Sequence, residues 1–356
     1  MLVRTIHGTI PSLPLEAIEL RDGERSQYGG KDAVNMFLRR SAIKTLALTA
    51  LSMRLSSGIA SSFADDAVRA RKLRARMPAL ACDCHAHVIG PYEQYPMIVT
   101  RAYTPPTASV QKIRAMHRTL GIDRSVLVQP SFYGSDNACL LSALQQLGTN
   151  ARGVAVVPES ASKQQLDSLH VSGIRGIRIN RAGSARDRNE LPAVVEAAGR
   201  QAAERNWHVQ LFLPMPVIAE IAPIIEASPA PFVLDHFAGA RASGTTQPGF
   251  ERVLRLIERG HAYLKLTAPY HASQPPDYPG MGELAAAFID ANPERVLWGT
   301  DWPHTPWVSG QSVDTISPFY PADNVRLLEL LFEWVPEEST RSAILVDNPA
   351  RLFGFS

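Results

Sequence analysis

The strongest constraint on the fold of this chain is a regular alternation of two kinds of segment from residue 80 to the end. Short runs rich in β-branched residues alternate with longer runs whose apolar residues recur at helical spacing, as in Val110, Ile113 and Met116 before Gly121. The short runs predict eight strands, at residues 80–88, 124–129, 152–158, 174–180, 208–213, 231–236, 262–268 and 295–301.

Eight β/α units in residues 80–356 predict an α/β protein with a single (β/α)8 TIM barrel, a fold that typically takes about 250 residues. A further helix at residues 337–345 is expected as a C-terminal addition to the barrel. A doubly wound sheet is the alternative fold. It would need fewer strands or a second domain, and no linker marks such a domain.

Polar side chains gather where several of the predicted strands end. His85 and His87 close the first strand, His236 closes the sixth, and Asp301 closes the eighth. In a barrel of this kind the C-terminal ends of the strands surround the active site. With an ordinary pKa of about 3.9, Asp301 is ionised near neutral pH and can take a proton from water as a general base. These four residues are the predicted catalytic set. Alternation along the first and sixth strands also predicts that Asp83 and Leu234 face inward.

The fourth strand carries the predicted substrate-binding residues Arg178 and Asn180 on its inward face. A guanidinium at the barrel mouth is costly unless an anion meets it, so Arg178 predicts a carboxylate or phosphate on the substrate. An internal ion pair of Arg178 with Asp83 or Asp301 is the alternative. Ser131 and Tyr103 lie in loops after the second and first strands and are candidates to hydrogen-bond a substrate oxygen.

Six sequence pieces, in this order along residues 80–354, resemble the amidohydrolase-related barrels. They are Asp83–His87, Gly173–Asn180, Trp207–Gln210, Leu234–His236, Leu297–His304 and Asp347–Leu352. Three more pieces make the chain most similar to the 2-pyrone-4,6-dicarboxylate lactonase group: Tyr103–Pro105, Val128–Ser131 and Gly134–Asn137.

This resemblance implies a hydrolase that opens a carboxylated lactone. It implies that the three histidines polarise the ring carbonyl, that Asp301 activates water, and that Arg178, Ser131 and Tyr103 hold the substrate. The chain departs from the group at Phe212, where the group has tyrosine, and at His271, where it has arginine. A further arginine of the group falls near Ser184, where Arg181 or Arg186 could substitute. We therefore expect a lactone or related ester other than the pyrone dicarboxylate.

The metal content predicted from the sequence is none. A two-metal centre needs a bridging lysine or glutamate on the fourth strand and a histidine on the fifth, and this chain has Asn180 and Gln210 there. One zinc held by His85, His87 and Asp301 stays open as an alternative. That alternative brings a second function, the zinc-dependent decarboxylation of an aromatic or enol acid. A third interpretation is an exported binding protein that has kept the pocket but has no catalytic activity.

The composition limits the partners of the chain. A net charge of +2 and no basic run interleaved with aromatics argue against nucleic acid, and three cysteines are too few for a disulfide framework. The expected partner is a small carboxylated molecule, and a homodimer stays open.

Residues 1–79 form a separate N-terminal extension. Arg39 and Arg40 precede a short apolar stretch, and residues 62–64 resemble a cleavage site, so residues 36–64 predict a twin-arginine export signal and a periplasmic location. Arg54 interrupts the apolar stretch, which argues against a membrane span. A cytoplasmic protein with a basic extension is the alternative. Translation from Met36 would give a conventional signal.

Overall fold

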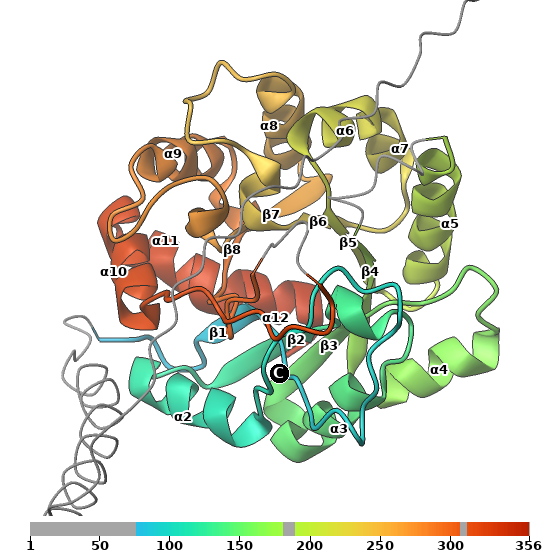
Figure 1. Cartoon of the computed structure of the whole chain (residues 1–356). Helices are drawn as coiled ribbons and strands as arrows, with labels where there is room; N and C mark the ends of the chain where they lie inside the picture. Colours follow the sequence, from blue (N-terminus) through green and yellow to red (C-terminus); the bar gives the residue numbers. More distant parts are fainter. Residues whose placement is uncertain (1–75, 181–188, 307–311, 356) are drawn as a thin grey trace, which may run out of the picture. The chain divides into compact units, whose positions relative to one another are not determined.

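The fold of the chain, seen in a computed structural model, is described for residues 76–180, 189–306 and 312–355. Eight parallel strands follow one another in chain order around one sheet, and helices lie outside them (Figure 1). The strands are β1 (Cys82–Ala86), β2 (Arg124–Val128), β3 (Ala151–Ala155), β4 (Ile174–Asn180), β5 (His208–Phe212), β6 (Phe232–Leu234), β7 (Ala262–Leu266) and β8 (Val296–Trp298). All eight predicted strands are confirmed, and all but β4 are shorter than predicted.

The helices fill the connections between the strands. They are α2 (Val110–Leu120), α3 (Ala138–Leu147), α4 (Lys163–Val171), α5 (Leu191–Ala203), α6 (Met215–Glu220), α7 (Ala222–Ala227), α8 (Phe250–Glu258), α9 (Met281–Ala291), α10 (Asn324–Trp334), α11 (Glu338–Ser342) and α12 (Asn348–Phe353). Helix α2 shows how the sequence sets these bounds. The Ser109 side chain accepts a hydrogen bond at its start, and Gly121 ends it in the left-handed conformation at φ 72°.

The segment after β8 closes the ring against β1. The backbone N–H of His87 donates to the Trp302 carbonyl at 2.7 Å, and the N–H of Asp301 donates to the His85 carbonyl at 2.8 Å. Ala86 and Trp302 form a parallel bridge at the same place. The first and last strands therefore meet, as a (β/α)8 barrel requires.

The extra C-terminal helix covers the end of the barrel where the strands begin. The Phe353 ring lies 5.2 Å from the ring of His208, which opens β5, and the Arg124 guanidinium at the start of β2 lies 5.2 Å above the Phe355 ring. The helix predicted at 337–345 extends further than expected, through a π-helical turn (Ala343–Asp347) into α12. Pro349 lies in the first turn of α12 and has no N–H, so it donates no hydrogen bond to the preceding π-helical turn.

The predicted export signal and the N-terminal extension up to residue 75 lie outside the described residues, as do Arg181, Ser184 and Arg186. Among the described helices, none has the length and apolar character needed to cross a membrane. Cys82, Cys84 and Cys139 are free and buried.

Candidate active site

The site lies at the C-terminal ends of the strands, beside the segment that closes the ring. An irregularity in the pairing of β1 with β2 between Asp83 and Ala86 changes which side chains face inward. Cys82 and Cys84 pack in the apolar cluster inside the barrel, while the Asp83 carboxylate points to His117 on α2, with 3.0 Å between Oδ2 and Nε2. The prediction that Asp83 shares its inward direction with the two histidines is therefore wrong, because the irregularity resets the alternation.

His236 and Asp301 lie beyond their strands, not at the last position of each as predicted. β6 ends at Leu234 and β8 at Trp298. His236 opens the short turn η3 (His236–Gly239), and both residues have positive φ, 50° for His236 and 61° for Asp301. A positive φ is unfavourable for residues with a Cβ, and such strain collects at functional sites.

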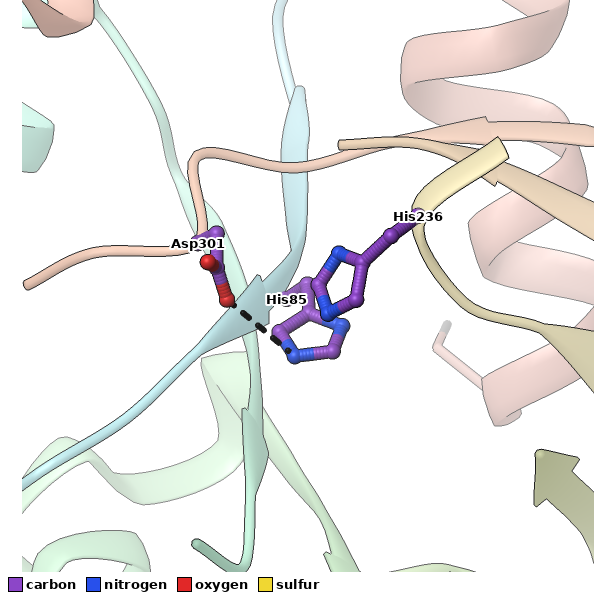
Figure 2. Close-up of side chains that lie close together, drawn as sticks. All are labelled: His85, His236 and Asp301. Carbon is purple, nitrogen blue, oxygen red and sulfur yellow. Dashed lines mark ion pairs between the residues drawn. The ribbon is translucent and has the colours of Figure 1, made fainter. Parts of the chain in front are cut away.

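Asp301 is the centre of a group of imidazoles. Its Oδ1 atom lies 3.4 Å from Nε2 of His85 and 3.4 Å from Nε2 of His87 (Figure 2 shows the first of these contacts). The ring of His236 lies 4.7 Å from that of His85, and the Tyr270 hydroxyl donates to Asp301 Oδ2. Burial raises the pKa of the Asp301 carboxyl, but the neighbouring imidazoles outweigh it and leave that pKa well below its ordinary value. The carboxylate is therefore ionised at neutral pH, as a general base requires.

The three histidines differ in their surroundings. His87 Nδ1 donates to the Val128 carbonyl at 2.7 Å, so Nε2 is the nitrogen that faces the cavity. His236 Nδ1 lies 2.7 Å from the Thr267 hydroxyl, which can either donate or accept. His85 is fully buried, and burial lowers its pKa to about 4. A neutral imidazole at His85 follows from that pKa.

A cavity of about 160 Å³ opens above this group. The predicted residues His87, His236, Asp301, Arg178, Asn180, Ser131 and Tyr103 all line it. His85 lies beneath its floor and does not. Phe212 and His271 form an aromatic wall of this cavity, with their ring centroids 6.0 Å apart. The two departures noted in the sequence therefore lie in the cavity itself.

The Arg178 guanidinium is only partly paired. Its Nη1 donates to the Gln129 carbonyl at 2.6 Å, and its Nη2 lies 3.8 Å from Asp235 Oδ2. Its Nε has no hydrogen-bond partner among the described residues, although the side chain is only 4% exposed. The internal ion pair considered for Arg178 exists, but its partner is Asp235.

Three residues under the site were missed from the sequence: Lys265 on β7, Asp235 after β6 and Gln210 on β5. All are buried, and Asp235 Oδ1 lies 3.2 Å from His85 Nδ1 and 3.4 Å from Lys265 Nζ. Parity along the predicted sixth strand placed Leu234 and His236 inward. Leu234 in fact packs in the helix-facing core and Val233 in the barrel interior. A lysine in the middle of an otherwise apolar strand was the signal that could have found the cluster.

The donor set suits one metal ion. His85, His236 and Asp301 each offer one ligand atom, and these atoms lie within 4.8 Å of one another. Within the part of the chain that the structure describes, His85 Nε2 has no hydrogen-bond partner, which leaves it available to a metal ion. Two imidazoles and a carboxylate fit a zinc ion with an open fourth position. This set has His236 in the place of the predicted His87.

Comparison with known proteins gives the family of the chain. The sequence model of the amidohydrolase family matches residues 82–355. The chain belongs to this family. This amidohydrolase is 32% identical over 288 residues to the 4-sulfomuconolactone hydrolase of Hydrogenophaga intermedia, which covers 79% of the chain and 91% of that protein. It is 31% identical over 289 residues to the 2-pyrone-4,6-dicarboxylate hydrolase of Comamonas testosteroni. That alignment covers 78% of this chain and 91% of the relative.

A solved structure supports the same assignment. A probable 2-pyrone-4,6-dicarboxylic acid hydrolase from Acinetobacter baumannii, with citric acid bound, matches this amidohydrolase with a TM-score of 0.65 and 27% identity over 78% of this chain and all of that one. The barrel fold and the membership of a hydrolase family are thus shown together, and this amidohydrolase is an enzyme, a hydrolase.

Proposed function

We propose that this amidohydrolase opens a carboxylated lactone, or a related ester, with water that Asp301 activates. The observation that carries the proposal is the buried Arg178 guanidinium in the lining of the same small cavity as Asp301, with its nearest carboxylate, Asp235, 3.8 Å from Nη2. A buried cation is costly unless it is closely paired, and a substrate carboxylate in the cavity would pair with the guanidinium through a charge-assisted bond. The lactone hydrolases among the relatives support the reaction type.

The reaction follows from the positions of the groups. Asp301 takes a proton from water, the water oxygen bonds to the ring carbonyl carbon, and the ring C–O bond breaks. The proton then passes from Asp301 to the departing ring oxygen, so that the base is restored. His236 and His87, which line the cavity, are placed to polarise the carbonyl, and His236 carries its proton on Nε2 whenever Thr267 donates to Nδ1.

The cavity also orients the substrate. With the carboxylate at Arg178, the lactone ring lies between Asn180 and the aromatic wall of Phe212 and His271. Ser131 and Thr305 hydrogen-bond the Tyr103 hydroxyl, whose pKa is raised by burial, so the phenol is protonated and can donate to a substrate oxygen.

A zinc-dependent decarboxylase of an aromatic or enol acid is the second candidate, supported by the ligand set of His85, His236 and Asp301. Zinc bound there would act as a Lewis acid on the substrate carbonyl. Release of CO2 by protein that contains one zinc per chain would select this function over lactone hydrolysis.

The test of the proposed function is a set of carboxylated lactones assayed with wild-type protein and with Asp301→Asn. The variant should lose turnover by about 10²–10⁴-fold, the range for a general base, while calorimetry still detects substrate binding. Asp167→Asn, on the exposed face of α4, is the matched control and should keep full activity. Turnover retained in Asp301→Asn would refute Asp301 as the base.

Arg178→Met tests the substrate carboxylate separately. Loss of a hydrogen bond to a charged group, about 1.5–3 kcal/mol, should raise KM for the anionic lactone by about 10–100-fold. A neutral ester of the same lactone should show no such change.

Export and assembly are proposals of the same kind. We propose a periplasmic enzyme delivered by the twin-arginine signal at residues 36–64, acting on a small carboxylated molecule and without nucleic-acid or membrane partners. N-terminal sequencing of protein from the native host tests this, and an intact Met1 or Met36 would refute cleavage. A homodimer would be detected by light scattering.

A further inference from the structure

A buried lysine lies directly beneath the catalytic group. Lys265 is fully buried, and its Nζ donates to Gln210 Oε1 at 2.7 Å and lies 3.3 Å from His85 Nδ1. The side chain does not line the cavity, so it cannot contact a substrate there. A buried ammonium is costly unless it is paired, and Asp235 Oδ1, 3.4 Å away, supplies the opposite charge.

His85 Nδ1 thus has two neighbours with opposite requirements. An ammonium can only donate a hydrogen bond, and a carboxylate can only accept one. Asp235 Oδ1 lies 3.2 Å from this nitrogen and Lys265 Nζ lies 3.3 Å from it, so the two groups compete for Nδ1. When Lys265 donates to Nδ1, the proton of a neutral imidazole is on Nε2.

The direction of Nε2 gives this tautomer a consequence. His85 Nε2 lies 3.4 Å from Asp301 Oδ1 and has no hydrogen-bond partner among the residues that the structure describes. His87 has the opposite arrangement, because its Nδ1–H donates to the Val128 carbonyl and its Nε2 faces Asp301. The two histidines of one short motif therefore differ at Nδ1, which faces an ammonium in His85 and a carbonyl oxygen in His87.

We infer that Lys265 is a positioning residue that fixes His85 as the Nε2–H tautomer, so that His85 orients Asp301 and does not contact the substrate. A chain of two donors then runs from Lys265 through His85 to the general base. The same tautomer has no lone pair on Nε2, so a metal ion held by His85 Nε2 would require the other tautomer. The importance of this chain for turnover rests on the proposed function, but the tautomer itself does not.

The tautomer can be measured without substrate. Protein with ¹⁵N-labelled histidine rings gives separate signals for the protonated and bare nitrogens, and the His85 signals are identified by their loss in His85→Asn. In the wild-type protein we expect the proton on Nε2. In Lys265→Met we expect it on Nδ1, next to Asp235. Gln210→Met is the matched control, because it disturbs the same cluster but keeps the Lys265–His85 contact, and its His85 should resemble wild type.

The kinetic consequence is a split between kcat and KM. Lys265→Met should lower kcat for the lactone by about 10–100-fold, because one preorganised donor acts on the base, while KM changes little. A wild-type His85 with its proton on Nδ1, or a tautomer that Lys265→Met leaves unchanged, would overturn the inference. If Lys265→Met does not fold, the wild-type NMR spectrum alone tests the inference, because it shows whether the His85 proton is on Nε2 or Nδ1. Absence of lactone hydrolysis in wild-type protein would refute the proposed function and leave the tautomer result standing.

Discussion

Thr300 connects the general base to the first strand and offers a quantitative test of how the site is held. Its hydroxyl donates to Asp83 Oδ2 at 2.6 Å and accepts from the Trp302 backbone N–H at 3.0 Å, and its own N–H donates to Asp83 Oδ1 at 2.9 Å. Burial raises the pKa of the Asp83 carboxyl, but the bonds from His117 and Thr300 bring it below the ordinary value, so these are bonds to a charged group. Thr300→Val keeps the shape of the side chain and removes the hydroxyl.

The cost can be worked out from these contacts. Losing a bond to a charged acceptor costs about 1.5–3 kcal/mol, and leaving the Trp302 N–H unsatisfied costs about 1–3 kcal/mol. The added methyl group recovers about 0.8 kcal/mol. Thr300→Val should therefore lower the free energy of unfolding by about 2–5 kcal/mol. Thr300→Ser keeps the hydroxyl and loses one methyl group, so it should cost about 1 kcal/mol.

Urea unfolding followed by tryptophan fluorescence measures both variants, and an unchanged m-value would show that the folded and unfolded states are comparable. Activity gives a second measurement. Asp301 follows Thr300 directly, and a displacement of about 1 Å at the base can cost about 100-fold in rate, so kcat of Thr300→Val should fall while that of Thr300→Ser should not. Equal stability of the two variants, within about 0.5 kcal/mol, would refute the reasoning.

Three further predictions concern the cavity, metal and packing. His271→Arg adds a cation to the aromatic wall and should improve kcat/KM for a lactone with two carboxylates relative to one, whereas an unchanged ratio would show that the wall does not set substrate charge. Treatment with a chelator should leave lactone hydrolysis unchanged, with elemental analysis as the check, and activity that returns only with added zinc would contradict polarisation by imidazoles alone. Gly176→Ala would place a Cβ 2.4 Å from the His208 ring and should destabilise the barrel by about 1–3 kcal/mol in a urea titration, an effect that His208→Ala should relieve.

The sequence predicted the fold well because the fold depends on repeated local patterns. Alternation on β4 correctly placed Arg178 and Asn180 inward, with Ile177 and Ile179 in the helix-facing core. Seven of the predicted site residues line the cavity, because each lies on or after a strand near the mouth of the barrel.

The errors arose where the backbone departs from regular alternation. The pairing irregularity on β1 turned Asp83 outward, and the early end of β6 brought Asp235 rather than Leu234 toward His85. Lys265 was missed for a different reason. Its partners come from β1, β5 and the segment after β6, and no local pattern shows that three distant segments will surround one ammonium.

The hydrogen bonds between His85, His87 and the segment at Asp301 and Trp302 join the two ends of the barrel sequence. Catalytic activity therefore shows whether the ring of strands has closed. A folding intermediate with only the first seven strands in place would contain the three histidines, but Asp301 would not yet be in position. A circular permutant that opens an outer loop elsewhere should keep activity, and one that breaks the chain between residues 299 and 301 should not, even if its barrel assembles. Two halves of the barrel, expressed separately and then mixed, can be tested by the same assay. Recovery of turnover would show that the two halves have assembled into a complete ring.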